Sequence, residues 1–421
     1  MTNAATKAAT SAAKNPVAKA LIGAGLVPVV LLGALCGPVR AADGTLLTFG
    51  LGFRLASDSN PALTPVNPGS STTTALDLSF GLSEESAQSK LVLGLSGSLA
   101  RYGGSGNTAS NGLVNPNLTL AYSHTAGDAE FSLNGGLTTA NLGQNTAVTD
   151  FQTGAGTRAT ATLSTGVSFA KTGPLGLDLT AGQTDVTYQN APGLLASRTL
   201  QLGATAHADL SPVLHLGLGL HNSRFSQDGQ SARNTPGLNA SLTLDRKTGS
   251  YVASLTSDRA PEGRRSTLEL SHQLELAVGG SLSYSLGATR AATGSNYVVG
   301  ALAYQQTLAQ GAVSLGLNRA VQANAFTNAE TVVSAANLGY TRDITPRGSL
   351  ALALNWAQQR DTAFGLVTAN TNLSATWTQA LAADWALDFG YTRRLRAQDF
   401  VGQSHSDSLF LTLHRDFSVR Y

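Results

Sequence analysis

Histidines and carboxylates at two-residue spacing are the side chains of this chain best suited to chemistry. His207, Asp209 and His215 would share one face of two neighbouring strands joined by a turn at Ser211. Two imidazoles and a carboxylate could hold a transition metal. A metal site needs a further convergent ligand, which the spacing does not assure, so the simpler interpretation is favoured, in which these polar side chains face water. We predict no metal and no cofactor.

A second pair, His221 and Ser223, could act as a general base and a nucleophile. Same-face neighbours on a strand lie about 7 Å apart, and the sequence shows no acid to orient the histidine. The chain has no Walker-type loop, dinucleotide-binding glycine motif, cysteine-based metal site or Gly-x-Ser-x-Gly elbow. We therefore predict that it is not an enzyme, and a hydrolase remains the less favoured alternative.

A third group consists of charged residues that share a face with small polar side chains. Its members are Arg54, Asp77, Glu130, Asp178, Glu269, Glu275 and Asp388. If this face lines a pore, its acidic excess favours a weak cation preference. The alternative, which we rank higher, is that scattered wall charges hold water and pair with neighbours.

Strands must position all of these residues, because apolar and polar residues alternate along the chain. The first example is Leu47, Phe49, Leu51, Phe53 and Leu55, which alternate with small or polar residues. Successive side chains of a strand point to opposite faces, so one face is leucine-rich and the other is small and polar. The same pattern recurs to the C-terminus and predicts an all-β chain of about 20 strands, within a range of 16 to 22.

Overall composition excludes several classes of protein. Only 12% of the 421 residues are charged, 42% are hydrophobic, and the formal net charge is +2. Such low charge argues against a typical cytosolic enzyme, while the hydrophobic content argues against disorder. No basic excess is available to hold a polyphosphate, so we expect no nucleic-acid partner.

The first 41 residues have the pattern of a cleaved secretory signal. Lys7, Lys14 and Lys19 precede an apolar run over residues 20–37, and Val39 and Ala41 occupy the −3 and −1 positions of a small-residue cleavage site. A membrane anchor is disfavoured because glycines and a proline interrupt the run. We predict a signal peptide over residues 1–41 and a single β-domain over residues 42–421.

Connections between the predicted strands alternate between short turns and longer polar loops. The longer loops are expected at residues 58–71, 103–115, 141–156, 226–234 and 394–403, and a charged outer loop at residues 259–265. This alternation predicts an up-and-down antiparallel meander. In outer-membrane barrels the short turns are periplasmic and the long loops extracellular, where arginines of a charged loop could contact lipopolysaccharide.

A membrane barrel fits these patterns better than a soluble sandwich. The polar face carries Gly, Ser, Thr, Ala and Asn, whereas the solvent face of a sandwich normally carries lysine and glutamate. Aromatic residues gather at strand ends, as in the interfacial girdles of membrane barrels. The girdle residues expected beside short turns include Tyr122, Phe169, Trp377, Trp385, Phe417 and Tyr421.

The final strand, Phe417 to Tyr421, ends in an aromatic residue and resembles the C-terminal targeting strand of bacterial outer-membrane β-barrels. This resemblance implies a porin-like barrel of a Gram-negative outer membrane, assembled by the barrel-assembly machinery. The segment Asp58 to Pro65 is also similar to one in β-barrel porins associated with exopolysaccharide loci, which implies a role in glycan export or retention.

Small inward residues cannot fill a barrel of this size. We therefore predict a water-filled channel for passive diffusion of small hydrophilic solutes. The alternatives are a barrel for polysaccharide export or surface adhesion and, less favoured, a barrel hydrolase. Oligomers are common among porins, but no residue of the sequence marks a protomer interface.

Overall fold

The computed structural model describes residues 44–106, 109, 111–142, 147–152, 154, 156–260, 262–276, 279–324, 326–382 and 384–421. The predicted signal peptide, residues 1–41, lies outside the described residues. In the described part of the chain, no helix is long and apolar enough to span a membrane.

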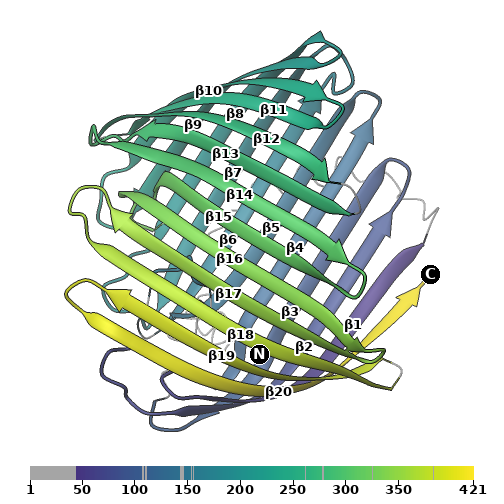
Figure 1. Ribbon diagram of the computed structural model, residues 1–421, viewed down its shortest axis with the longest axis vertical. Helices are drawn as coiled ribbons and strands as arrows, with labels where there is room; N and C mark the ends of the chain where they lie inside the picture. Colours follow the sequence, from purple (N-terminus) through teal and green to yellow (C-terminus); the bar gives the residue numbers. More distant parts are fainter. Residues whose placement is uncertain are drawn as a thin grey trace, which may run out of the picture.

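Twenty β-strands make up the described fold (Figure 1). They are β1 Thr45–Asp58, β2 Ser71–Glu85, β3 Ser89–Gly103, β4 Gly112–Ala126, β5 Ala129–Asn141, β6 Thr157–Phe169, β7 Leu175–Gln189, β8 Ser197–Ser211, β9 Leu214–Gln227, β10 Arg233–Arg246, β11 Gly249–Ala260, β12 Gly263–Leu276, β13 Gly280–Arg290, β14 Asn296–Leu308, β15 Gly311–Ala323, β16 Glu330–Thr345, β17 Gly348–Asp361, β18 Val367–Ala382, β19 Trp385–Gln398 and β20 Gly402–Arg420.

Each strand pairs antiparallel with its neighbours in sequence, and β20 returns to pair with β1. The seam runs from Leu46 opposite Arg420 to Asp58 opposite Ser408. At its end the Thr45 and Tyr421 backbones exchange two hydrogen bonds of 3.1 and 2.9 Å. The sheet is therefore a closed barrel without a free edge, and the predicted all-β fold of about 20 antiparallel strands is confirmed.

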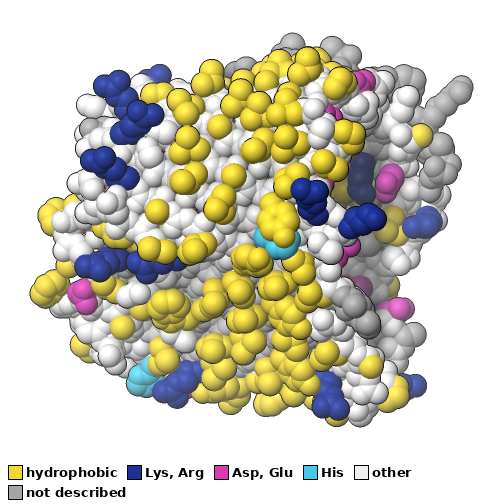
Figure 2. Space-filling view, turned by 45° about the horizontal axis from the view of Figure 1, so that its top comes forward, with side chains coloured by type: hydrophobic (Ala, Val, Ile, Leu, Met, Phe, Trp, Pro, Cys, Tyr) yellow, Lys and Arg dark blue, Asp and Glu magenta, His cyan; other side chains and the backbone are white. Residues whose placement is uncertain are grey.

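Leucines cover the outer surface of this barrel. Leu220, Leu270 and Leu286 are 68%, 61% and 66% exposed, although each lies within a strand that is paired on both sides. Figure 2 shows hydrophobic side chains spread over most of one face, with Lys and Arg mostly toward its margins. Alternation places the small polar residues on the opposite, inner face.

The connections differ in length at the two ends of the barrel. At one end the turns are short, such as residues 127–128, 212–213 and 247–248, while the other end carries the loops 59–70 and 142–156. Two expected loops are wrong. Residues 394–398 belong to β19, and only residues 261–262 separate β11 from β12. Charged side chains interrupt the alternation of apolar and polar residues in both places. A strand prediction based on hydrophobic alternation therefore does not recognise these residues as extended.

An arginine introduced on the outer face should destabilise the folded barrel far more than an arginine introduced on the inner face. We expect Leu270→Arg to lower the free energy of unfolding in lipid by about 2–4 kcal/mol, because it places a charge in hydrocarbon. The neighbouring inward change, Ser271→Arg, should cost much less. Urea unfolding in phospholipid vesicles measures both, and equal stabilities would contradict a lipid-facing leucine surface.

Candidate functional site

The inner face of the barrel encloses the largest candidate site. A circular barrel of 20 strands is roughly 40 Å wide between backbones, given the usual strand spacing and tilt. Small side chains form long stretches of its inner face, as in the inward sets Thr119, Ala121 and Ser123 of β4 and Ser281, Ser283 and Ser285 of β13. Side chains of this size leave a wide lumen.

The seven charges predicted to line the lumen all have inward register. Arg54 lies 4.0 Å from Asp77, which also accepts a hydrogen bond from Ser98. Lys171 pairs with Glu130. Glu269 and Glu275, both on β12, have no ion pair within the described residues.

Two of the predicted carboxylates, Asp178 and Asp388, have histidine partners near the turn end of the barrel. His207 lies 3.6 Å from Asp178, and His414 lies 3.4 Å from Asp388. Thr378 also donates a 2.7 Å hydrogen bond to Asp388. Most of the seven predicted charges thus have a partner, and Glu269 and Glu275 are the exceptions in the described part of the structure.

Carboxylates concentrate on the turn-side half of the inner face. They come from β2, β5, β7, β8, β10, β12, β16, β19 and β20, namely Glu85, Glu130, Asp178, Asp209, Asp245, Glu275, Asp343, Asp388 and Asp416. Lys90 and Lys171 at this end each pair with one of these carboxylates, and Lys247 lies in the turn between β10 and β11. This half of the lumen therefore carries an acidic excess.

The predicted metal-like cluster is only partly brought together. His215 lies between two carboxylates, with its Nδ1 2.6 Å from Asp209 and its Nε2 3.2 Å from Asp245. His207 pairs with Asp178 instead. Among the described residues, no group of three or more His, Cys, Asp or Glu side chains is arranged to hold a metal ion.

His221 has an orienting acid that the sequence did not reveal. Its Nε2 lies 2.8 Å from the buried Asp258 of β11, which Arg265 also contacts at 2.5 Å. The two side chains meet across β10 because residue 237 is glycine, and a Cβ there would collide with both. Within the described residues, no hydrogen bond joins His221 to Ser223. His221 thus belongs to a cluster on the inner wall together with Asp258 and Arg265.

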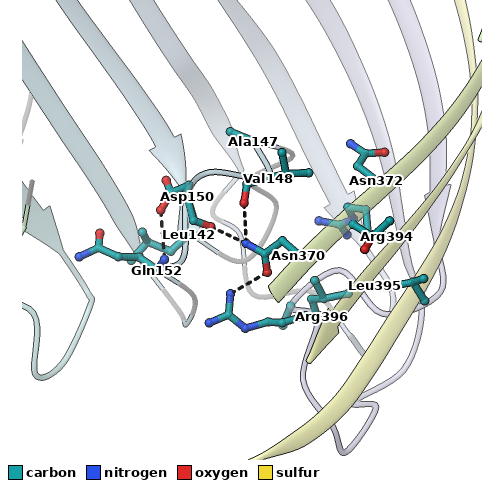
Figure 3. A pocket seen from close by; sticks show the side chains of 13 residues that line it. Leu142, Ala147, Val148, Asp150, Gln152, Asn370, Asn372, Arg394, Leu395 and Arg396 are labelled. Atoms are coloured by element: carbon teal, nitrogen blue, oxygen red, sulfur yellow. Dashed lines mark hydrogen bonds between the residues drawn. The ribbon is translucent and has the colours of Figure 1, made fainter. Parts of the chain in front are cut away.

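The loop that joins β5 to β6 reaches across the barrel to β18 and β19 (Figure 3). The Asn370 amide donates to the carbonyls of Val148 and Asp150 at 2.9 and 3.1 Å. Arg396 donates to the Phe151 carbonyl at 2.8 Å and to Asn370 at 3.3 Å. Both side chains are buried, at 7% and 8% exposure, by the loop that they hold.

The same loop is fastened to its own side of the wall. Arg158 of β6 pairs with Asp150 at 2.5 Å and donates to Gln152 at 3.2 Å. Tyr188 of β7 donates to the same Gln152 oxygen at 3.0 Å. The loop is therefore held from both sides. It narrows the opening of the barrel at the end that carries the longer loops, which we call the mouth.

Two other loops contribute to this mouth. In the β1–β2 loop, Asn60 is 3% exposed and hydrogen-bonds to β20, while Arg394 reaches Asp58 at 2.7 Å and the Pro61 carbonyl at 3.3 Å. From the β15–β16 loop, the Phe326 ring lies under the Arg158 guanidinium at 4.8 Å. A cavity of about 410 Å³ remains between Phe326, the β5–β6 loop and strands β15–β18.

Sequence reasoning missed the residues that build this mouth. Asn370 lies in an inward polar set, and Arg394 and Arg396 were expected in an outer loop. One feature of the sequence does point to the two arginines. Arg394 and Arg396 are two residues apart, so on an extended strand both side chains lie on the same face, which here is the inner face.

The predicted girdle aromatics have outward register near the short turns. They are Tyr122, Phe169, Trp377, Trp385, Phe417 and Tyr421. Tyr122 packs against Phe131, with ring centroids 6.2 Å apart. The Arg415 guanidinium lies 4.3 Å from the Phe417 ring and 5.6 Å from the Trp385 ring, so a cation is held among aromatics at this level.

Comparisons with known proteins give no family. No family model matches the chain, and no curated protein matches it. Among solved structures, it is similar to the siderophore receptor PirA from Acinetobacter baumannii at 9% identity, over 90% of this chain and 81% of that one, with a TM-score of 0.49. It is also similar to the FrpB iron transporter from Neisseria meningitidis at 9% identity, over 89% and 82% of the two chains, with a TM-score of 0.48.

A third similar structure is OccK2 (OpdF) from Pseudomonas aeruginosa, at 10% identity over 89% of this chain and 98% of that one, with a TM-score of 0.46. Likenesses this distant carry no information about function. The function must therefore be inferred from the residues of this chain.

The tether between the β5–β6 loop and β19 should control the width of the mouth. Arg396→Gln removes a charge-assisted hydrogen bond to Phe151, which should favour the released loop by about 1.5–3 kcal/mol, or roughly 10- to 100-fold in population. We expect higher or noisier single-channel conductance. The matched outer-face change Arg393→Gln should leave conductance unaltered, and identical traces for the two variants would contradict the tether.

Proposed function

We propose that this protein is an outer-membrane channel for passive diffusion of small hydrophilic solutes. The observation that carries this proposal is the combination of a closed 20-stranded barrel with an inner face in which small hydroxyl, amide, glycine and alanine residues surround the charged ones. Such a surface holds water, and side chains of this size leave a lumen unfilled. The leucine exterior supports placement in lipid.

The proposed location is the outer membrane of a Gram-negative bacterium. The sequence pattern of residues 1–41 supports export, and the aromatic end of β20 supports delivery to the barrel-assembly machinery. With this orientation the short turns face the periplasm and the narrowed mouth faces outward.

Solute size would be set at the mouth and ion preference deeper in the lumen. The tethered β5–β6 loop and the Phe326 loop reduce the opening at the extracellular end. Beyond them, solutes would pass the acidic turn-side half. Acidic walls attract cations, so the channel would favour cations weakly.

Planar-bilayer recording of the refolded chain, residues 42–421, tests the channel. We expect stable unit conductance and a reversal potential that favours cations in a salt gradient. A protein that inserts with β-rich circular dichroism and conducts nothing would contradict diffusion and favour polysaccharide export or adhesion.

Glu269 and Glu275 of β12, which have no ion pair among the described residues, should account for part of the ion preference. We expect Glu269→Gln combined with Glu275→Gln to shift the reversal potential toward the nonselective value, because two uncompensated lumen charges are lost. Glu84→Gln, at the turn end of the outer face, is the control and should have no effect. An unchanged reversal potential in the double variant, or an equal shift in the control, would contradict an acidic lumen.

A further inference from the structure

An unusual group of arginines lies on the outer face of β9 to β13 at the loop end. Arg224, Arg259, Arg264 and Arg290 have outward register and are exposed. None of the four has an ion pair within the described residues. The outward positions of these five strands hold no aspartate or glutamate, so the group is not neutralised by its own wall.

Two of these arginines are directly opposed. Arg259 of β11 faces Arg264 of β12 in the ladder, which brings their Cβ atoms to about 4.5–5.5 Å. Like charges at this spacing repel unless an anion lies between them. Arg264 is also positioned, because its Nε donates a 2.7 Å hydrogen bond to the hydroxyl of the buried Ser257.

A groove of about 680 Å³ lies beside this pair. Leu220, Pro236 and Leu238 supply apolar lining, while Arg259 and Arg264 supply cationic groups. Two carboxylates, Asp258 and Glu262, also line the groove. Each of them already has an arginine partner outside the opposed pair, Arg265 for Asp258 and Arg233 for Glu262. Leu220 is 68% exposed, which leaves a broad apolar surface below the arginines. Apolar wall and paired cations thus adjoin in a single concave surface.

This juxtaposition fits an amphiphile with a polyanionic head and acyl chains. Guanidinium groups bind phosphate oxygens in a bidentate manner, and two of them can share one phosphate group. Acyl chains would cover Leu220 and Leu238. A soluble anion would leave the leucines bare, and a neutral lipid would leave the arginines unpaired.

We propose that the groove lined by Leu220, Leu238, Arg259 and Arg264 binds a phosphorylated glycolipid of the outer leaflet through its phosphate groups. The inference rests on the proposed outer-membrane location, which places the loop end of the barrel among such lipids.

The test is native mass spectrometry of the delipidated, refolded chain with bisphosphorylated lipid A and with the same lipid after phosphate removal. We expect retention of the bisphosphorylated lipid only. Arg259→Gln combined with Arg264→Gln should weaken retention by about 10- to 30-fold, as expected for two cations near an anionic headgroup.

The matched control is Arg246→Gln combined with Arg342→Gln, two exposed outward arginines at the turn end of β10 and β16. It removes the same charge from the same face and should retain the lipid. Heat-modifiable migration on gels verifies that each variant forms a barrel.

Equal retention by both double variants, or retention of the dephosphorylated lipid, would overturn the proposed site. Conductance measured on the same preparations separates the two proposals. A conducting barrel that retains no lipid A overturns the glycolipid site alone, and a nonconducting barrel with Arg259- and Arg264-dependent retention supports the site while it contradicts the diffusion channel.

Discussion

Complete hydrogen bonding of the backbone governs the architecture of this barrel. In hydrocarbon every peptide N–H and C=O must find a partner in the protein, and a sheet meets this demand only when its last strand returns to its first. Here β20 pairs with β1 along the full length of β1. Because this closure hides the backbone, leucine can cover the outside and small polar residues can face the lumen.

Closure also determines how charge is distributed. On the inner face, carboxylates gather toward the turns, while buried arginines near the loops hold carbonyl groups of segments that cross the mouth. Arg396 and Arg394 act there as structural donors rather than as free charges in a pore. On the outer face, the arginines of β9 to β13 lie above the leucine band, at the level where lipid headgroups would begin.

The strand number and the division into two faces could be predicted because a two-residue period is a local property of sequence. Leu47 to Leu55 shows it without any knowledge of partners. The mouth could not be predicted, since Asn370 and Val148 are 222 residues apart and meet only after the barrel closes. The same limit applies to Asp258, which reaches His221 across an intervening strand at a glycine.

The proposed function requires that the closed barrel encloses a continuous aqueous route narrowed at one end. Liposome swelling with uncharged sugars of increasing size tests this requirement, because uptake of an uncharged sugar reports passage without ion selectivity. We expect rapid swelling with the smallest sugar and a sharp decline with larger oligosaccharides. Exclusion of every sugar by liposomes that contain the folded barrel would contradict it.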